Sequence, residues 1–100
     1  MGARVTFDRG RLSELCRRHG IRRLSLFGSV LRDDFRPDSD VDVLVEFKPG
    51  ARTGFAVVDM EDELTGLFGG RRADLVNAKY LNRHLRDRIL ASAELQYAEG

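Results

Sequence analysis

Two aspartates at the start of a predicted strand are the side chains best placed for chemistry. Along residues 40–47, the side chains of one face alternate with those of the other. The apolar face holds Val41, Val43, Val45 and Phe47, and the second face holds Asp40, Asp42, Leu44 and Glu46. This period of two predicts a strand over residues 41–47. Asp40 and Asp42 would then project together, roughly 6–7 Å apart along the strand. That spacing suits two oxygen ligands of a divalent cation.

A glycine–serine pair upstream predicts an anion-binding turn. Residues 24–27 form a short apolar run typical of a buried strand, and Gly28 and Ser29 follow it before a helical segment expected to begin near Val30. Glycine lets the backbone approach a phosphate closely, serine offers a hydroxyl, and a helix start presents free N–H groups. Each feature alone also has a plain explanation, because Gly-Ser is commonly only a turn and Asp-Val-Asp can be a solvated strand end.

The segment between the turn and the aspartates adds candidate ligands. Arg32 and Arg36 could reach a triphosphate, although three aspartates lie equally close to them in the sequence. Ser39 stands beside Asp40 and could orient that carboxylate through a hydrogen bond.

The order of these features resembles a known superfamily. A short strand is followed by the segment GSVLRDDFRPDSDVDVLV. This segment contains Gly-Ser, a polar spacer and an Asp-x-Asp pattern that opens a second strand. This segment resembles the nucleotidyltransferases that include DNA polymerase β, and it is most similar to their minimal, single-domain bacterial members. The resemblance covers nearly the whole chain. It implies that Gly28, Ser29, Arg32 and Ser39 bind the nucleotide.

The resemblance also implies a third carboxylate. Asp74 lies in a short apolar run after a predicted helix, where the superfamily places it; without the resemblance it would be only a polar residue at a strand end. Three such carboxylates suit Mg²⁺, which binds oxygen ligands and shares substrate phosphates. Two ions are then expected. Asp40 and Asp42 would bridge both, and Asp74 would bind the ion that activates the acceptor hydroxyl.

Composition limits the partners. One hundred residues predict a single domain over 1–100, and seventeen basic against sixteen acidic side chains give a formal charge of +1. No general attraction to a long nucleic acid follows from that balance. The single cysteine excludes an internal disulfide, and no apolar run is long enough to cross a membrane, so the expected location is the cytoplasm.

Helical spacing and alternation predict the remaining elements. Helices are expected from Asp8 to His19, over 55–68 with an acidic solvated face, and over 81–90. Strands are expected near 22–28, 41–47, 72–77 and 93–98, the last being favoured over a continued helix. Cys16 falls among apolar positions and is expected to be a buried core residue. The predicted fold is α/β, a small mixed sheet with helices mainly on one face.

Two functions of different classes follow. The first is a metal-dependent nucleotidyltransferase, which the resemblance specifies as one that moves AMP from ATP to a tyrosine of a small helical HEPN-type toxin and acts as its antitoxin. The second is a module that neutralises such a partner by contact alone. The intact set of Gly28, Ser29, Asp40, Asp42 and Asp74 favours catalysis. An aminoglycoside-type enzyme is less consistent with the chain, which has no room for a drug-binding domain. The acceptor is expected to dock on the 48–54 loop and near Asp74.

Overall fold

The computed structural model describes residues 5–31, 36, 39–50 and 56–99. In chain order, the elements are α1 (Arg9–His19), β1 (Ile21–Phe27), the 3-10 turn η1 (Gly28–Leu31), β2 (Val41–Phe47), α2 (Ala56–Leu67), β3 (Ala73–Asn77), the 3-10 turn η2 (Ala78–Tyr80), α3 (Arg83–Ser92) and β4 (Glu94–Ala98). The four predicted strands and the three longer predicted helices are present. The tail is a strand, as favoured from its alternation.

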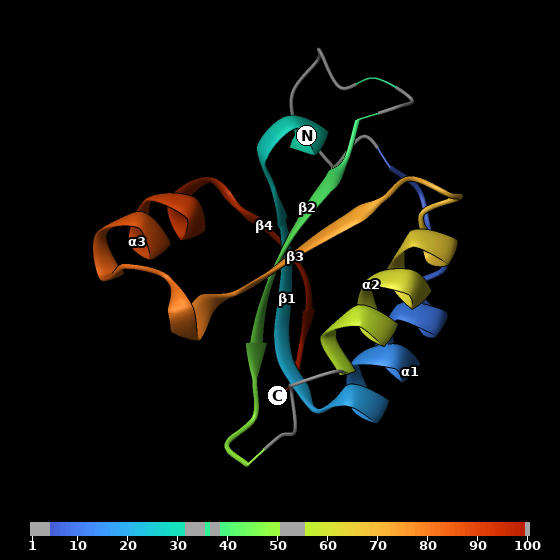
Figure 1. Ribbon diagram of the computed structural model, residues 1–100, viewed down its shortest axis with the longest axis horizontal. Helices are drawn as coiled ribbons and strands as arrows, with labels where there is room; N and C mark the ends of the chain where they lie inside the picture. The colour runs from blue at the N-terminus through green and yellow to red at the C-terminus, as the bar shows by residue number, and fades with distance from the viewer. Residues whose placement is uncertain (1–4, 32–35, 37–38, 51–55, 100) are drawn as a thin grey trace.

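The four strands form one mixed sheet in the order β3-β2-β1-β4. β1 is antiparallel to both β2 and β4, whereas β2 and β3 are parallel and are connected through α2. α1 and α2 lie on one face of the sheet, and α3 lies on the other (Figure 1). The α/β fold with helices mainly on one face is therefore confirmed.

The first helix begins and ends where the sequence predicts. The Asp8 carboxylate accepts a hydrogen bond from the Arg11 N–H (3.1 Å), and Gly20 ends the helix in the left-handed conformation with φ 69°. Cys16 is fully buried, and this burial, only partly opposed by the charge of Arg17, raises the pKa of its thiol to about 12. Such a thiol is a packing residue, not a nucleophile.

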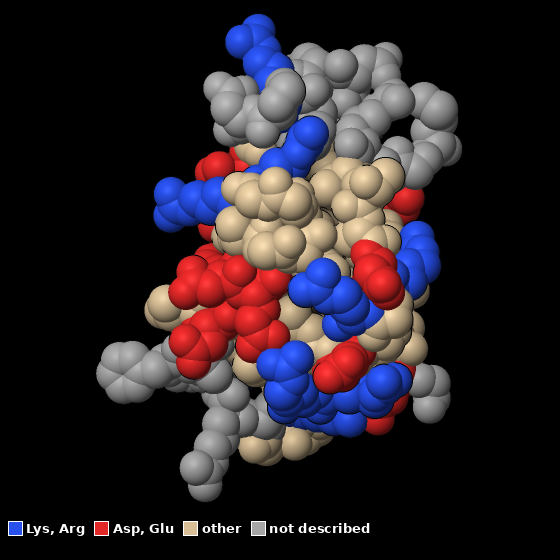
Figure 2. Space-filling model, turned by 90° about the vertical axis from the view of Figure 1, so that its right-hand side faces the viewer, with Lys and Arg blue, Asp and Glu red and all other residues tan. Residues whose placement is uncertain are grey.

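An ion-paired cluster joins the outer surfaces of α1 and α2. Arg18 Nη1 donates to both carboxylate oxygens of Glu63, at 2.7 and 2.9 Å, and His19 Nε2 lies 3.1 Å from Oε1. The acidic run of α2 was predicted to be a solvated face. Glu63 departs from that prediction, because its carboxylate binds the neighbouring helix α1. Acidic and basic side chains form adjoining patches on this side of the molecule (Figure 2).

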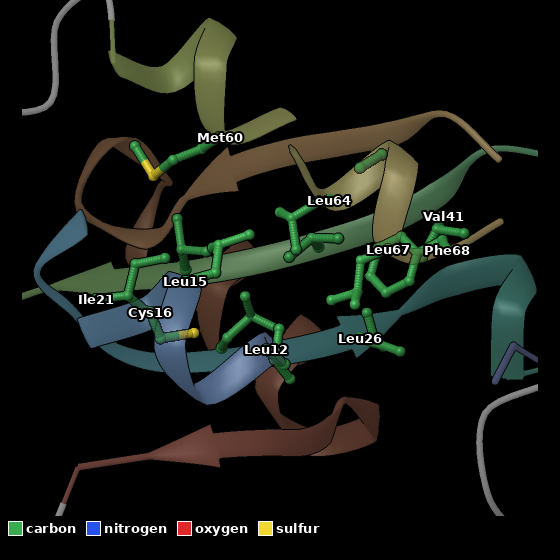
Figure 3. Packing of buried hydrophobic residues seen from close by; sticks show 14 of the residues in the cluster. Leu12, Leu15, Cys16, Ile21, Leu26, Val41, Met60, Leu64, Leu67 and Phe68 are labelled. Carbon is green, nitrogen blue, oxygen red and sulfur yellow. The ribbon is translucent and has the colours of Figure 1, made fainter. Parts of the chain in front are cut away.

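The core fills the space between these two helices and the sheet. Leu12 and Leu15 of α1 and Met60 and Leu64 of α2 pack against strand residues such as Val41 (Figure 3). Each such aliphatic side chain contributes about 1.5–3 kcal/mol when fully buried. This layer fixes one face of the sheet, so the chemistry must lie on the other face or at an end.

One predicted element is different, and one finding concerns membranes. The helix expected to begin near Val30 is instead the four-residue 3-10 turn η1, which already starts at Gly28. A turn this short has no appreciable macrodipole, so phosphate binding at Gly28 and Ser29 would depend on their backbone N–H groups and the serine hydroxyl, and it stays a prediction. Among the described residues, no helix is long and apolar enough to cross a membrane.

Candidate active site

Gly28, Asp42 and Asp74 come together at one end of the sheet. β1 ends there, while the parallel strands β2 and β3 begin there. Phe27 is the register partner of Asp42, and Asp42 is the register partner of Asp74. Neighbouring strands lie about 4.8 Å apart, so the two aspartates are adjacent on the sheet. The pairing of Asp42 with Asp74 was expected only from the family resemblance, because their separation in sequence gives no local signal.

The two aspartates lie on the face opposite α1 and α2. Val41 and Val43, which flank Asp42, are fully buried in the core with those helices. Because side chains alternate along a strand, Asp42 points to the other face, and its register partner Asp74 shares that face. Asp42 is half-buried, whereas Asp74 and Asp40, the residue immediately before β2, are exposed. A substrate can therefore reach the carboxylates from the side of α3.

Gly28 is held close to the Asp42 carboxylate. Its φ of 76° lies in the left-handed region, and a Cβ built there would fall directly on Oδ2 of Asp42 and 3.3 Å from its Cγ. A side chain at position 28 would displace the carboxylate. From the sequence, Gly28 was expected to approach a phosphate, which stays a prediction; in the structure its backbone approaches the carboxylate of a predicted metal ligand.

Hydrogen bonds from α2 position β3 and thus Asp74. Thr65 Oγ1 accepts from the Ala73 N–H (3.0 Å), and Glu61 Oε2 accepts from the Leu75 N–H (3.1 Å). These two N–H groups flank Asp74 and point to the outer edge of the sheet, where no strand pairs with β3. Without Thr65 and Glu61 they would lack these hydrogen-bond acceptors. Sequence reasoning missed both contacts. The spacing of four residues between Glu61 and Thr65, which places them on one helix face, was the available signal.

The remaining predicted ligands lie in the loop before β2. Ser39 Oγ accepts from the Arg36 N–H (3.1 Å), and the Ser39 N–H donates to the Arg36 carbonyl (3.0 Å), which closes a turn. Its predicted contact with Asp40 stays a prediction. Ser29 is half-buried in η1. Arg32 lies outside the described residues.

The carboxylates are not gathered as a formed metal site. In the part of the chain that the structure describes, no three Asp, Glu, His or Cys side chains are grouped closely enough to hold a metal ion. The donor set itself suits Mg²⁺, because it is made of hard carboxylate oxygens, and the absence of a side chain at Gly28 makes room for the Asp42 carboxylate. Asp40, Asp42 and Asp74 thus remain the predicted ligands.

The loop after β2 does not flank this site. Lys48 follows the end of β2 opposite to Asp42, about 20 Å from it at the usual rise of about 3.3 Å per strand residue. The prediction that the 48–54 loop borders the carboxylates was wrong for its described residues 48–50, because β2 runs its full length between them. Residues 51–54 lie outside the described part.

Comparison with known proteins gives one family. Residues 10–95 match the family described as the nucleotidyltransferase domain. A protein of Methanocaldococcus jannaschii, provisionally named a protein adenylyltransferase, is 36% identical over 76 residues, which are 76% of this chain and 80% of that protein. The protein adenylyltransferase MntA of Thermococcus cleftensis is 35% identical over 77 residues, covering 77% and 76%.

Solved structures share the fold. A minimal nucleotidyltransferase is 41% identical, with a TM-score of 0.72 and 85% of each chain covered. A complex of a tri-AMPylated HEPN toxin of Shewanella oneidensis with its MNT antitoxin gives a TM-score of 0.65 at 17% identity, covering 91% of this chain and 70% of that chain. The second similarity establishes the fold alone.

Proposed function

Because the chain belongs to the nucleotidyltransferase domain family, we propose that it transfers AMP from ATP to a tyrosine hydroxyl of a small helical HEPN-type toxin, and so acts as its antitoxin. The observation that carries this proposal is the β2–β3 register, which sets Asp42 beside Asp74 on an open face, with Gly28 against the Asp42 carboxylate.

The proposed transfer is an in-line displacement. The acceptor oxygen bonds to the α-phosphorus of ATP, the bond from that phosphorus to the β-phosphate oxygen breaks, and pyrophosphate leaves. Asp74, the exposed carboxylate, accepts the hydroxyl proton. Gly28 and Ser29, with Arg32 and Ser39, hold the triphosphate at the end of β1.

Magnesium is part of the proposal. Asp40, Asp42 and Asp74 would hold two ions, which neutralise charge on the phosphates and lower the pKa of the acceptor hydroxyl. These ions make the reaction metal-dependent, so a chelator removes the activity while leaving the fold intact.

The comparisons support the nature of the partner. Two relatives more than a third identical are named protein adenylyltransferases, and a neighbour in fold is an antitoxin bound to an AMPylated HEPN toxin. The formal charge of +1 supports a protein acceptor over a long nucleic acid. Dependence on ATP supports a cytoplasmic location. A gene beside that of this chain should encode the short helical acceptor.

Mass spectrometry of that acceptor tests the proposal. After incubation with this chain, ATP and Mg²⁺, its intact mass should rise by one or more AMP units, and fragment spectra should map them to tyrosine. A tyrosine→Phe variant at the mapped position should stay unmodified. If the toxin is inhibited with no change in mass, the chain neutralises it by contact alone and the proposed transfer is wrong.

A further inference from the structure

The helix α3 is poorly buried for an element of so small a protein. None of its residues is buried, whereas α1 buries three. Leu85 and Leu90 remain 46% and 40% exposed, and Tyr80, just before the helix, is 74% exposed. An amphipathic helix is normally stabilised by burying its apolar side chains. Here much of that apolar area stays in water.

The helix α3 lies on the same side of the sheet as the carboxylates. α3 is on the side opposite α1 and α2 (Figure 1), and Asp42 and Asp74 point to that side. Leu95 of β4 is the register partner of Ser25, which shares a face with Asp42 because Ser25 pairs with Leu44. Leu95 is 54% exposed. α3 and Leu95 thus lie on the face from which an acceptor must approach, whereas Tyr80 lies beyond the far end of β3 from Asp74, near Lys48.

The charged side chains of α3 itself are predominantly basic, whereas Glu94 lies beside Leu95 in β4. α3 carries Arg83, Arg86 and Arg88 against a single acid, Asp87, which lies 4.0 Å from Arg86 Nε. Lys79 precedes the helix, with its ammonium 5.9 Å from the ring centroid of Tyr80. An excess of exposed arginines around leucines is complementary to an apolar surface rimmed by Asp and Glu.

We propose that the acceptor protein docks on this surface, the α3 surface, defined by Leu85, Leu90 and Leu95 with Arg83, Arg86 and Arg88. The inference rests on the proposed function. The acceptor contributes an apolar patch edged by acidic side chains, and docking brings its hydroxyl across the open face of the sheet toward Asp74. Leucines, which cannot stack on bases as aromatic residues do, favour a protein over RNA as the occupant.

Paired variants at matched exposure test the proposal. Leu85→Glu with Leu90→Glu should weaken binding of the purified HEPN-type protein by at least about tenfold, since charges are introduced into an apolar contact. Val58→Glu is the control, because Val58 is 58% exposed on α2, on the other face. A second pair, Arg83→Glu with Arg88→Glu, should show a similar loss, while Arg11→Glu with Arg17→Glu on α1 should not.

Two further measurements separate the possible failures. The circular dichroism spectrum of each variant should match that of wild type, because the substituted side chains are exposed. Binding of Mg-ATP should also match, because no substituted residue is among the predicted nucleotide ligands. If wild type binds and modifies the acceptor and both α3 pairs still bind it normally, the docking surface is wrong and the proposed function stands. If wild type neither binds nor modifies it, the proposed function fails as well. Loss of self-association or of RNA binding in the α3 variants, with acceptor binding unchanged, would assign the surface to a second copy or to RNA and overturn the proposal.

Discussion

Gly28 determines how closely the connection after β1 approaches the Asp42 carboxylate. Its φ of 76° nearly equals the 73° of Gly69, but only Gly28 has the carboxylate where a Cβ would be; around Gly69 that position has no atom within 4 Å. The two glycines therefore separate the cost of the backbone conformation from the effect of crowding Asp42.

We predict that Gly28→Ala loses nearly all AMP transfer, whereas Gly69→Ala loses only stability. Each alanine must adopt a left-handed φ, which costs roughly 1–2 kcal/mol. Only the first also pushes the Asp42 carboxylate away. Urea unfolding and AMP transfer, measured on both variants, check this. Wild-type transfer by a folded Gly28→Ala protein would show that the close approach has no catalytic role.

The sequence predicted this end of the site better at some residues than at others. Gly28, Asp40 and Asp42 could be singled out because turn chemistry and strand alternation are local. The close approach of Gly28 to Asp42 could not be predicted in the same way. It depends on the pairing of β1 with β2, and no local sequence pattern specifies that pairing. The contact of Ser39 with Asp40 stays a prediction; the turn that its hydroxyl closes with Arg36 was not foreseen.

At the scale of elements, α2 holds β3 through hydrogen bonds from its side chains. Thr65 Oγ1 accepts from the Ala73 N–H and donates to the Glu61 carbonyl at 2.8 Å. Ala73 is only 1% exposed, so water could not replace Thr65 Oγ1 as the acceptor of this N–H if the hydroxyl were removed. Sequence reasoning assigned helix and strand correctly but could not foresee this contact, which depends on how they pack.

We therefore predict that Thr65→Val lowers the free energy of unfolding by about 1–3 kcal/mol, the usual cost of an unsatisfied buried N–H. Thr65→Ser keeps the hydroxyl and should lose less. Hydrogen exchange at the Ala73 amide should accelerate in the valine variant alone. An unchanged exchange rate there would mean that the bond does not hold the start of β3.

Glu63 links α1 to α2 in a pH-dependent way. Burial raises its pKa, but hydrogen bonds and positive charge from His19 and Arg18 outweigh burial and hold the pKa of the carboxyl below its ordinary value. A carboxyl with a lowered folded pKa stabilises the protein above its unfolded pKa of about 4.3, and this contribution disappears as the pH falls through the lower folded value.

The expected result is that Glu63→Gln is less stable than wild type at pH 7 and that the difference shrinks below about pH 4. Chemical unfolding across this range provides the measurement. Asp62→Asn, an exposed neighbour on the same helix, is the matched control. A stability difference that stayed constant from pH 7 to pH 3 would rule out the ionised link.

At the scale of the molecule, the two faces of the sheet have different tasks. One face is sealed by α1 and α2 and supplies the core; the other keeps the carboxylates, the exposed leucines and α3. The sequence predicted the sheet, the four strands and the helices mainly on one face, because alternation and helical spacing record burial. It did not predict which end of β2 each loop occupies in space, so the 48–50 segment was wrongly placed beside the site.

We predict that Asp42 and Asp74 direct nucleotidyl transfer from the open face, and transfer of a radioactive label from ATP provides the test. With the helical acceptor and Mg²⁺, label from [α-³²P]ATP should enter the acceptor and label from [γ-³²P]ATP should not. Asp42→Asn and Asp74→Asn should each reduce α-label transfer by at least about a hundredfold, the scale for losing one electrostatic contact to a transition state. Both should stay folded, since removing one of two adjacent carboxylates relieves repulsion. Asp59→Asn, at an exposed position of α2, should transfer normally. Transfer of γ-label, or full α-label transfer by folded Asp42→Asn, would contradict the claim.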